Sequence, residues 1–149
     1  MIRLLDISFD SPAANLALDE VILDSAETGR VGETLRFWES PVPFVVLGVS
    51  QILRDEVHED ACIDDAVPIL RRCSAGGCVL QGPGCLNFSL ALTHEGHPEV
   101  RALRPSYCYI LNAICGALGT LGVTASHNGI SDIVVEGRKV SGNAQKRRK

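Results

Sequence analysis

The chain has 149 residues, of which 46% are hydrophobic and 21% are charged, and its formal net charge at pH 7 is −4. This length can enclose one buried core, and the balance of apolar and charged residues excludes an intrinsically disordered chain. Apolar runs stay well short of the roughly 18–20 residues that a membrane helix needs. Asp6 also interrupts the N-terminal apolar segment where a signal peptide would continue. We therefore expect a soluble, cytoplasmic protein with no membrane partner.

Positive charge is concentrated at one end of the sequence. Six of the 14 Lys and Arg residues, including all three lysines, lie between Arg138 and Lys149. Such a basic segment can bind nucleic acid, or it can be a solvated end. Nucleic-acid-binding domains carry a basic patch across a whole face, whereas the rest of this chain is acidic. We therefore expect no nucleic-acid partner.

The first third of the chain predicts a strand, a helix and two further strands. Residues 2–7 form the first strand, and a helix runs from Ser11 and Pro12 to about Ala26, because serine caps helices and proline suits the first helical position. One stripe of that helix is predicted to face the core. Its members are Ala14, Ala17, Leu18, Val21, Ile22 and Ser25.

Two apolar segments, residues 34–39 and 44–48, follow as strands. Pro41 and Pro43 make the connection between them rigid, and the unit resembles a hairpin. Residues 55–62 are predicted to form a short acidic helix.

The stretch from 71 to 89 organises the rest of the sequence. Arg71 and Arg72 lead into a small-residue turn that contains Gly76 and Gly77, and an apolar strand, a second glycine turn and another strand follow. Backbone without side chains, beside fixed positive charge, can touch an anionic ligand through its N–H groups. We interpret the stretch as a phosphate-binding loop. The alternative is a glycine-rich hairpin without a ligand, because the pattern matches neither of the named phosphate loops.

The last third predicts a helix followed by a hairpin. The helix spans residues 104–121, and its apolar stripe consists of Leu103, Tyr107, Ile110, Leu111, Ile114, Leu118 and Leu121. A strand begins at 123–125, and another at 133–135 leads through a tight turn at 136–137 to a return strand that starts at Lys139. A lysine between two turns can point inward, although most lysines lie in solvent.

No metal site is expected. The six cysteines form no Cys-x-x-Cys pair, which is the usual spacing of a zinc or redox motif. His94 and His97 have a spacing that could hold a metal, but glycine and proline surround them, so a mobile loop is favoured.

The order of these elements predicts an α+β fold. Strands and helices alternate, but the strands come in hairpin-like pairs, which favours a mostly antiparallel mixed sheet with helices packed on it. No repeat or linker divides the sequence, so residues 1–149 are expected to form a single domain.

Three segments together resemble the lipoate–protein ligase A and octanoyltransferase family. They are residues 15–20 (NLALDE), residues 71–77 (RRCSAGG) and residues 138–144 (RKVSGNA). The family is related in fold to biotin–protein ligases and to the catalytic domains of class II aminoacyl-tRNA synthetases. Since the family's catalytic domain continues beyond the third motif, the resemblance implies an N-terminal part of that domain, with weak or no activity by itself.

The resemblance also implies a reaction and a set of site residues. Lipoate or octanoate would react with ATP, supplied with Mg²⁺, to give acyl-AMP. The acyl group would pass to a lysine of a lipoyl carrier domain, such as that of a 2-oxoacid dehydrogenase E2 subunit or the glycine-cleavage H protein. Lys139 would be the catalytic residue, in contact with the acyl carbonyl and the nucleotide phosphate. Asp132 would lie near the adenylate and help to place Mg²⁺. The remaining residues that would bind the nucleotide or acyl-adenylate are Arg72, Gly76, Gly77, Cys78, Val79 and Leu80.

Two other functions stay open at this point. The first is an octanoyl or lipoyl carrier-to-protein transferase that uses a cysteine thioester without ATP. Cys73 is its best candidate nucleophile, because a thiol needs a positive neighbour to ionise, but no cysteine matches the family's nucleophile position. The second is a non-catalytic fragment that binds an acyl-nucleotide or a carrier. The match to the family loosens at Ala75, Gln81, Gly82, Cys85 and Ser131.

Overall fold

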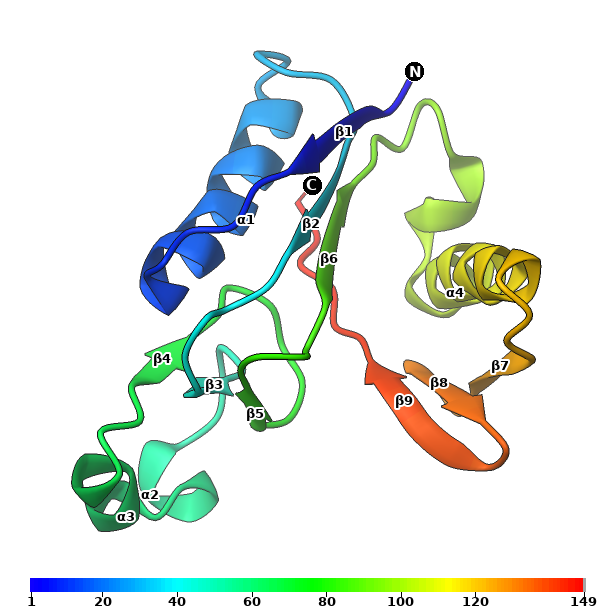
Figure 1. Cartoon of the computed structure of the whole chain (residues 1–149). Helices are drawn as coiled ribbons and strands as arrows, with labels where there is room; N and C mark the ends of the chain where they lie inside the picture. Colours follow the sequence, from blue (N-terminus) through cyan, green and yellow to red (C-terminus); the bar gives the residue numbers. More distant parts are fainter. Residues whose placement is uncertain (149) are drawn as a thin grey trace. The chain divides into compact units, whose positions relative to one another are not determined.

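The computed structural model describes residues 1–148, which form two compact units (Figure 1). The first unit contains Met1–Ala91 together with the segment that begins at Gln145, and the second contains Leu92–Ala144. Over the described residues, the two units contain three three-stranded sheets together with helices. This confirms the predicted α+β class. Within the described residues, no helix is long and apolar enough to cross a membrane.

The first sheet of the first unit has the order β1-β2-β6. Its strands are β1 (Arg3–Asp6), β2 (Thr34–Trp38) and β6 (Asn87–Ala91). The central strand β2 runs parallel to β1 and antiparallel to β6. Strands from near the two ends of Met1–Ala91 therefore flank the central strand of one sheet.

Helix α1 (Pro12–Glu27) begins where the sequence predicts. The Ser11 hydroxyl accepts a hydrogen bond from the Ala14 backbone N–H, which caps the first turn. The predicted core stripe is correct for Ile22, which is buried, and wrong for Ala17 and Val21, which are exposed. The helix also buries Asn15, a polar residue outside the predicted stripe.

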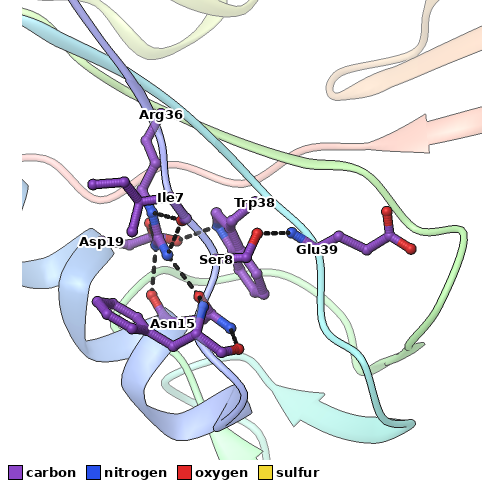
Figure 2. A network of polar contacts seen from close by, with 8 residues as sticks. Ile7, Ser8, Asn15, Asp19, Arg36, Trp38 and Glu39 are labelled. Carbon is purple, nitrogen blue, oxygen red and sulfur yellow. Dashed lines mark hydrogen bonds and ion pairs between the residues drawn. The ribbon is translucent and has the colours of Figure 1, made fainter.

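A buried arginine explains which face of α1 turns inward. The Arg36 side chain of β2 is fully buried and donates to the Asp19 carboxylate at 2.6 Å and to the Asn15 side-chain oxygen at 2.7 Å. Its other donors bind the backbone carbonyls of Asn15 and Ile7. Figure 2 shows these side chains converging on the guanidinium, with Trp38 also donating to Asp19. A buried cation needs such partners, so polar residues of α1 face the sheet.

The second sheet has the order β4-β3-β5, and β3 is its centre. Its strands are β3 (Phe44–Leu47), β4 (Ile69–Arg71) and β5 (Val79–Gln81), with β4 parallel and β5 antiparallel to β3. The predicted hairpin between residues 34–39 and 44–48 is wrong, because β2 and β3 belong to different sheets. The proline-containing connection carries the chain from one sheet to the other.

One apolar cluster holds the parts of the first unit together. Trp38, Phe44 and Val46 form its buried centre, and Leu16 and Leu70 pack against them. The predicted acidic helix at 55–62 is two shorter helices, α2 (Leu53–Glu56) and α3 (Glu59–Asp64). They are separate because Val57 adopts an extended conformation.

The second unit packs one helix on a three-stranded antiparallel sheet. It contains the 3₁₀ helix η1 (Pro98–Arg101), α4 (Leu103–Thr120), β7 (Ala125–Asn128), β8 (Asp132–Val135) and β9 (Arg138–Gly142), with sheet order β7-β8-β9. Tyr107, Leu111 and Ile133 form its core. Both the helix and the β8-β9 hairpin confirm the sequence prediction. The ends of the predicted stripe, Leu103 and Leu121, are exposed.

Candidate functional site

The glycine loop, defined here as residues 72–78, crosses the end of strand β3. It connects β4 to β5, and both of these strands pair with β3 rather than with each other. The prediction of a hairpin is therefore wrong for the pairing of these strands. A loop held above a central strand exposes its own backbone, and Ala75, Gly76 and Gly77 are all exposed.

Arg72 shapes this loop from within. Its guanidinium donates to the carbonyl oxygens of Ala75 and Gly77, both at 2.9 Å, and to the Ser74 hydroxyl at 3.1 Å. These bonds draw the loop carbonyls toward one positive charge. Arg72 is thus both the loop's internal support and a fixed cation at its surface.

The backbone N–H groups of residues 75–77 donate no hydrogen bond to any part of the chain that the structure describes. Gly76 has a φ of 101°, in the region that favours glycine. Exposed N–H groups next to an arginine are the combination that binds phosphate oxygens in proteins. Chemically, the loop is suited to an anion.

A second turn, residues 48–51, supports the glycine loop from below, and we call it the base turn. A Cβ added to Gly48 would lie 2.1 Å from the Gly76 carbonyl oxygen, so the two backbones touch. The Val49 N–H donates to the Ser74 carbonyl at 2.9 Å. Arg71 donates to the carbonyls of Gly48 and Gln51 at 2.7 and 2.8 Å. Sequence reasoning missed this turn, because its only local signal is a glycine at the end of a buried strand.

The second glycine turn, residues 82–84, is held by contacts of its own. The Gly84 N–H donates to the Glu39 carboxylate at 2.6 Å, and Gly82 lies against Pro43, where an added Cβ would be 3.1 Å from the proline Cα. Beside it, the side-chain oxygen of Gln81 is buried and accepts no hydrogen bond from the described residues. A buried acceptor without a hydrogen-bond partner typically costs about 1–3 kcal/mol.

Two cysteines of the glycine loop, Cys73 and Cys78, have raised pKa values. Burial raises the pKa of the Cys73 thiol, and the negative charge of Glu20 raises it further. Burial also raises the pKa of Cys78, followed by the charge of Glu56. Activated cysteines show the opposite shift, toward a lower pKa. For Cys73, the candidate nucleophile of the transferase alternative, this shift disfavours the thiolate.

A hollow of about 190 Å³ lies between α1 and the start of the glycine loop. Ligand pockets usually measure about 300–1,000 Å³, so this hollow is too small to enclose an acyl-nucleotide. Its lining consists of Ala13, Leu16, Ala17, Glu20, Leu70, Arg71, Arg72 and Cys73.

The second cluster of candidate residues lies on the β8-β9 hairpin of the second unit. The Lys139 ammonium is 2.9 Å from the Asp132 carboxylate, and the two side chains are 57% and 35% exposed. Lys139 is therefore held by a carboxylate while it remains open to solvent. The prediction that Lys139 follows a tight turn is confirmed, since Glu136 and Gly137 have φ values of 50° and 75°.

A side-chain clamp fixes the start of this hairpin. The Asn143 side-chain amide and backbone N–H both donate to the Ser131 carbonyl, at 2.8 and 3.0 Å. The same amide donates to the Ser141 hydroxyl at 3.2 Å. Asn143 therefore ties the end of β9 to the residue before Asp132.

The predicted site residues thus form two clusters, each internally ordered. Arg72, Gly76, Gly77, Cys78, Val79 and Leu80 belong to the first unit, and Asp132 and Lys139 belong to the second. Among the described residues, no group of three or more His, Cys, Asp or Glu side chains could hold a metal ion.

Comparison with known families decides the chain's membership. The model of the lipoyl protein ligase A/B catalytic domain matches residues 11–149. The chain belongs to this family. It is 31% identical over 141 residues to the lipoate–protein ligase LplJ of Bacillus subtilis, covering 93% of this chain and 39% of that protein. It is 33% identical over 121 residues to the octanoyltransferase LipM of Moorella thermoacetica, covering 80% of this chain and 44% of that one. The chain therefore spans less than half the length of these two relatives.

Solved structures agree with this membership. A bipartite lipoate–protein ligase from Thermoplasma acidophilum, studied with its E2 lipoyl domain, has a TM-score of 0.87 and 26% identity, covering 99% of this chain and 56% of that chain. A lipoate–protein ligase A bound with ATP has a TM-score of 0.83 and 27% identity, covering 99% and 62%. The resemblance that rested on three short motifs is confirmed for the family and its fold. The chain is a member of a family of lipoyl and octanoyl ligases and transferases.

Proposed function

We propose that this chain supplies nucleotide- and acyl-binding residues for ATP-dependent lipoate–protein ligation, with lipoate or octanoate as the acid. The carboxylate oxygen attacks the α-phosphorus of ATP, pyrophosphate leaves, and the acyl-AMP then reacts with a carrier lysine, releasing AMP. The observation that best supports this is the glycine loop, whose exposed N–H groups at residues 75–77 stand beside the Arg72 guanidinium. Such a loop suits phosphate oxygens.

Lys139 is proposed as the catalytic residue of the same reaction. Its ammonium is a compact charge on a flexible stem, which can neutralise the charge that develops on a phosphate or an acyl oxygen. Asp132 holds that ammonium at 2.9 Å. Mg²⁺, which enters with ATP as substrate, is commonly bound by one or two carboxylates and by substrate phosphates. Asp132 is a carboxylate of this kind, and its partial exposure fits that role.

Cysteine chemistry argues against Cys73 and Cys78 as thioester nucleophiles. The pKa values of Cys73 and Cys78 are raised, so at neutral pH their thiols are protonated and poorly nucleophilic. The transferase stays as the second candidate because the LipM relative is as similar to this chain as the LplJ relative. For the acceptor, we propose a lysine on a lipoyl carrier domain, in line with the E2 lipoyl domain studied with the Thermoplasma ligase.

The decisive experiment is lipoate-dependent exchange of labelled pyrophosphate into ATP, measured on the full-length protein. The ligase predicts exchange, and Lys139→Ala should lower its rate by roughly 100-fold or more through lost transition-state contacts. Acyl transfer from an acyl carrier without ATP, abolished by thiol alkylation, would instead establish the transferase.

A pair of glycine variants tests the role of the loop. A Cβ added to Gly77 meets nothing within 4 Å, and the same holds for Gly32, which lies far from the loop in sequence. Gly77→Ala should therefore fold normally but weaken ATP binding, because the new methyl group lies where a phosphate approaches the backbone. Gly32→Ala is the matched control and should bind ATP normally. Equal ATP affinity in both variants would contradict the assignment of the loop.

A further inference from the structure

The β8-β9 hairpin contains an irregularity next to its lysine. Asp132 pairs with Gly142 and Ile133 pairs with Ser141, but the next pair is Val134 with Lys139. One residue of β8 therefore corresponds to two residues of β9, and Val140 is the extra residue. This arrangement is a β-bulge, a feature that redirects side chains near functional sites.

The bulge decides the face on which Lys139 lies. Residues directly opposite each other in a ladder share a face, and faces alternate along each strand. Because Lys139 is opposite Val134, it lies on the face of Asp132. In a regular ladder continued from Asp132 and Gly142, Lys139 would be opposite Val135 and would lie on the other face. The observed ion pair at 2.9 Å agrees with the bulged register.

Two fixed points impose this bulge. At one end, the positive φ values of Glu136 and Gly137 define a tight two-residue turn that sets Val135 opposite Arg138. At the other end, Asn143 is bonded to the Ser131 carbonyl, which sets the register at Gly142. The chain between these points is one residue longer on β9 than on β8, and Val140 takes up the difference.

Gly142 supplies the space that this lysine occupies. A Cβ added to Gly142 would lie 3.0 Å from the Lys139 Cε and 3.1 Å from its ammonium nitrogen, closer than an ordinary contact. The lysine therefore passes over the Gly142 backbone, on the side where a side chain would project, to reach Asp132. The φ of Gly142 is not in the positive range, so its backbone does not require glycine.

We infer that Gly142 is a positioning residue of Lys139, which together with the Val140 bulge directs the ammonium to Asp132. The functional part of this inference rests on the proposed role of Lys139 in acyl activation, whereas the structural part does not. Glycine weakens a strand, so its presence in β9 is explained by the path of the lysine rather than by backbone conformation.

The structural part is tested by nuclear magnetic resonance of protein labelled with ¹³C-lysine. The chain has three lysines, and the Lys139→Ala spectrum identifies the Lys139 signal. Gly142→Val and Asp132→Asn should both move that signal, while Gly119→Ala, whose added Cβ meets nothing within 4 Å, should not. A Lys139 signal that Gly142→Val leaves in place would overturn the inference.

The functional part uses the rate of ATP–pyrophosphate exchange by the full-length protein. Gly142→Val should lower kcat by roughly 10- to 100-fold, as for a displaced catalytic group, with Gly142→Ala intermediate. Thermal stability should stay equal or rise, because valine favours strands. Wild-type turnover in Gly142→Val would refute the positioning role. Failure of the wild-type protein to catalyse exchange would instead refute the ligase proposal. The resonance of Lys139 in Gly142→Val would still test whether Gly142 positions the lysine.

Discussion

The ion pair Arg36–Asp19 in the first unit and the ion pair Lys139–Asp132 in the second have similar lengths, 2.6 and 2.9 Å, and opposite surroundings. Arg36 is completely buried and binds two backbone carbonyls and the Asn15 side chain in addition to Asp19. Lys139 is 57% exposed, and within the described residues its ammonium has the Asp132 carboxylate as partner. The Arg36 guanidinium is thus bound entirely by groups of the fold, whereas the Lys139 ammonium keeps donors available.

This difference indicates that the two positively charged side chains have different roles, one in the stability of the fold and the other in contact with a substrate. Arginine presents five donors in a rigid fork, which suits a buried junction between a helix and a sheet. Lysine presents a mobile charge, which suits contact with a substrate. We expect the first pair to control stability and the second to control activity, and substitutions can separate the two.

The largest expected effect comes from Asp19→Ala. It leaves the buried Arg36 cation without its counter-charge, so the free energy of unfolding should fall by about 3–5 kcal/mol. Urea denaturation followed by circular dichroism measures this. Glu20→Ala, at the exposed neighbouring position on α1, is the control and should change it by less than about 0.5 kcal/mol. Similar losses in both variants would contradict a structural role for the buried pair.

Gly48→Ala should have the next largest effect. The added methyl group would overlap the Gly76 carbonyl oxygen at 2.1 Å, so the base turn and the glycine loop must separate. We expect a loss of about 1–3 kcal/mol in the free energy of unfolding, as for overpacking elsewhere, together with weaker ATP binding measured by calorimetry. Gly32→Ala has open space and should show neither change. Unchanged ATP binding in Gly48→Ala would argue against the base turn as the support of the loop.

Lys139→Met should change stability by less than about 1 kcal/mol, because exposed ion pairs contribute little. The same variant should lose pyrophosphate exchange. Lys139→Met should thus lose activity while keeping stability. Asp19→Ala, in contrast, should mainly lower the free energy of unfolding. A stability loss as large as that of Asp19→Ala would mean that the exposed pair is also structural.

The smallest expected effect concerns the pH dependence of Cys73. Thiolate is the form that reacts with iodoacetamide. Because the pKa of Cys73 is raised, its alkylation rate should reach half of its maximum at a pH above the ordinary pKa of a cysteine thiol. Glu20→Gln removes a negative charge that raises this pKa and should move the midpoint to lower pH. Mass spectrometry of the Cys73 peptide across a pH series reports the midpoint. A midpoint below the ordinary value would revive Cys73 as a nucleophile.

Local signals made part of the fold predictable. Ser11 and Pro12 mark the start of α1, and Glu136 and Gly137 mark the hairpin turn, since capping and turn chemistry act within a few residues. The inward face of α1 was not predictable, because it depends on Arg36, which lies on β2 and is buried against sequence preference.

The pairing of strands that are far apart in the sequence also could not be predicted from local sequence patterns. Residues 34–39 and 44–48 are neighbours in sequence and belong to different sheets, because each strand finds partners far along the chain. Within the candidate site, the arginine and glycines of the loop could be selected from the sequence. The contact between Gly48 and Gly76, and the path of Lys139 over Gly142, exist only in three dimensions.

The double pairing of β3 limits how the glycine loop can respond to a ligand. Its two ends are fixed to strands on either side of β3, so they stay about 9–10 Å apart, which is twice the spacing of neighbouring strands. Between these ends, the loop is restrained by Arg72, whose guanidinium binds the Ala75 and Gly77 carbonyls, and by the contact of Gly76 with Gly48. A ligand that moves the loop must therefore break bonds within the loop as well as contacts with the base turn.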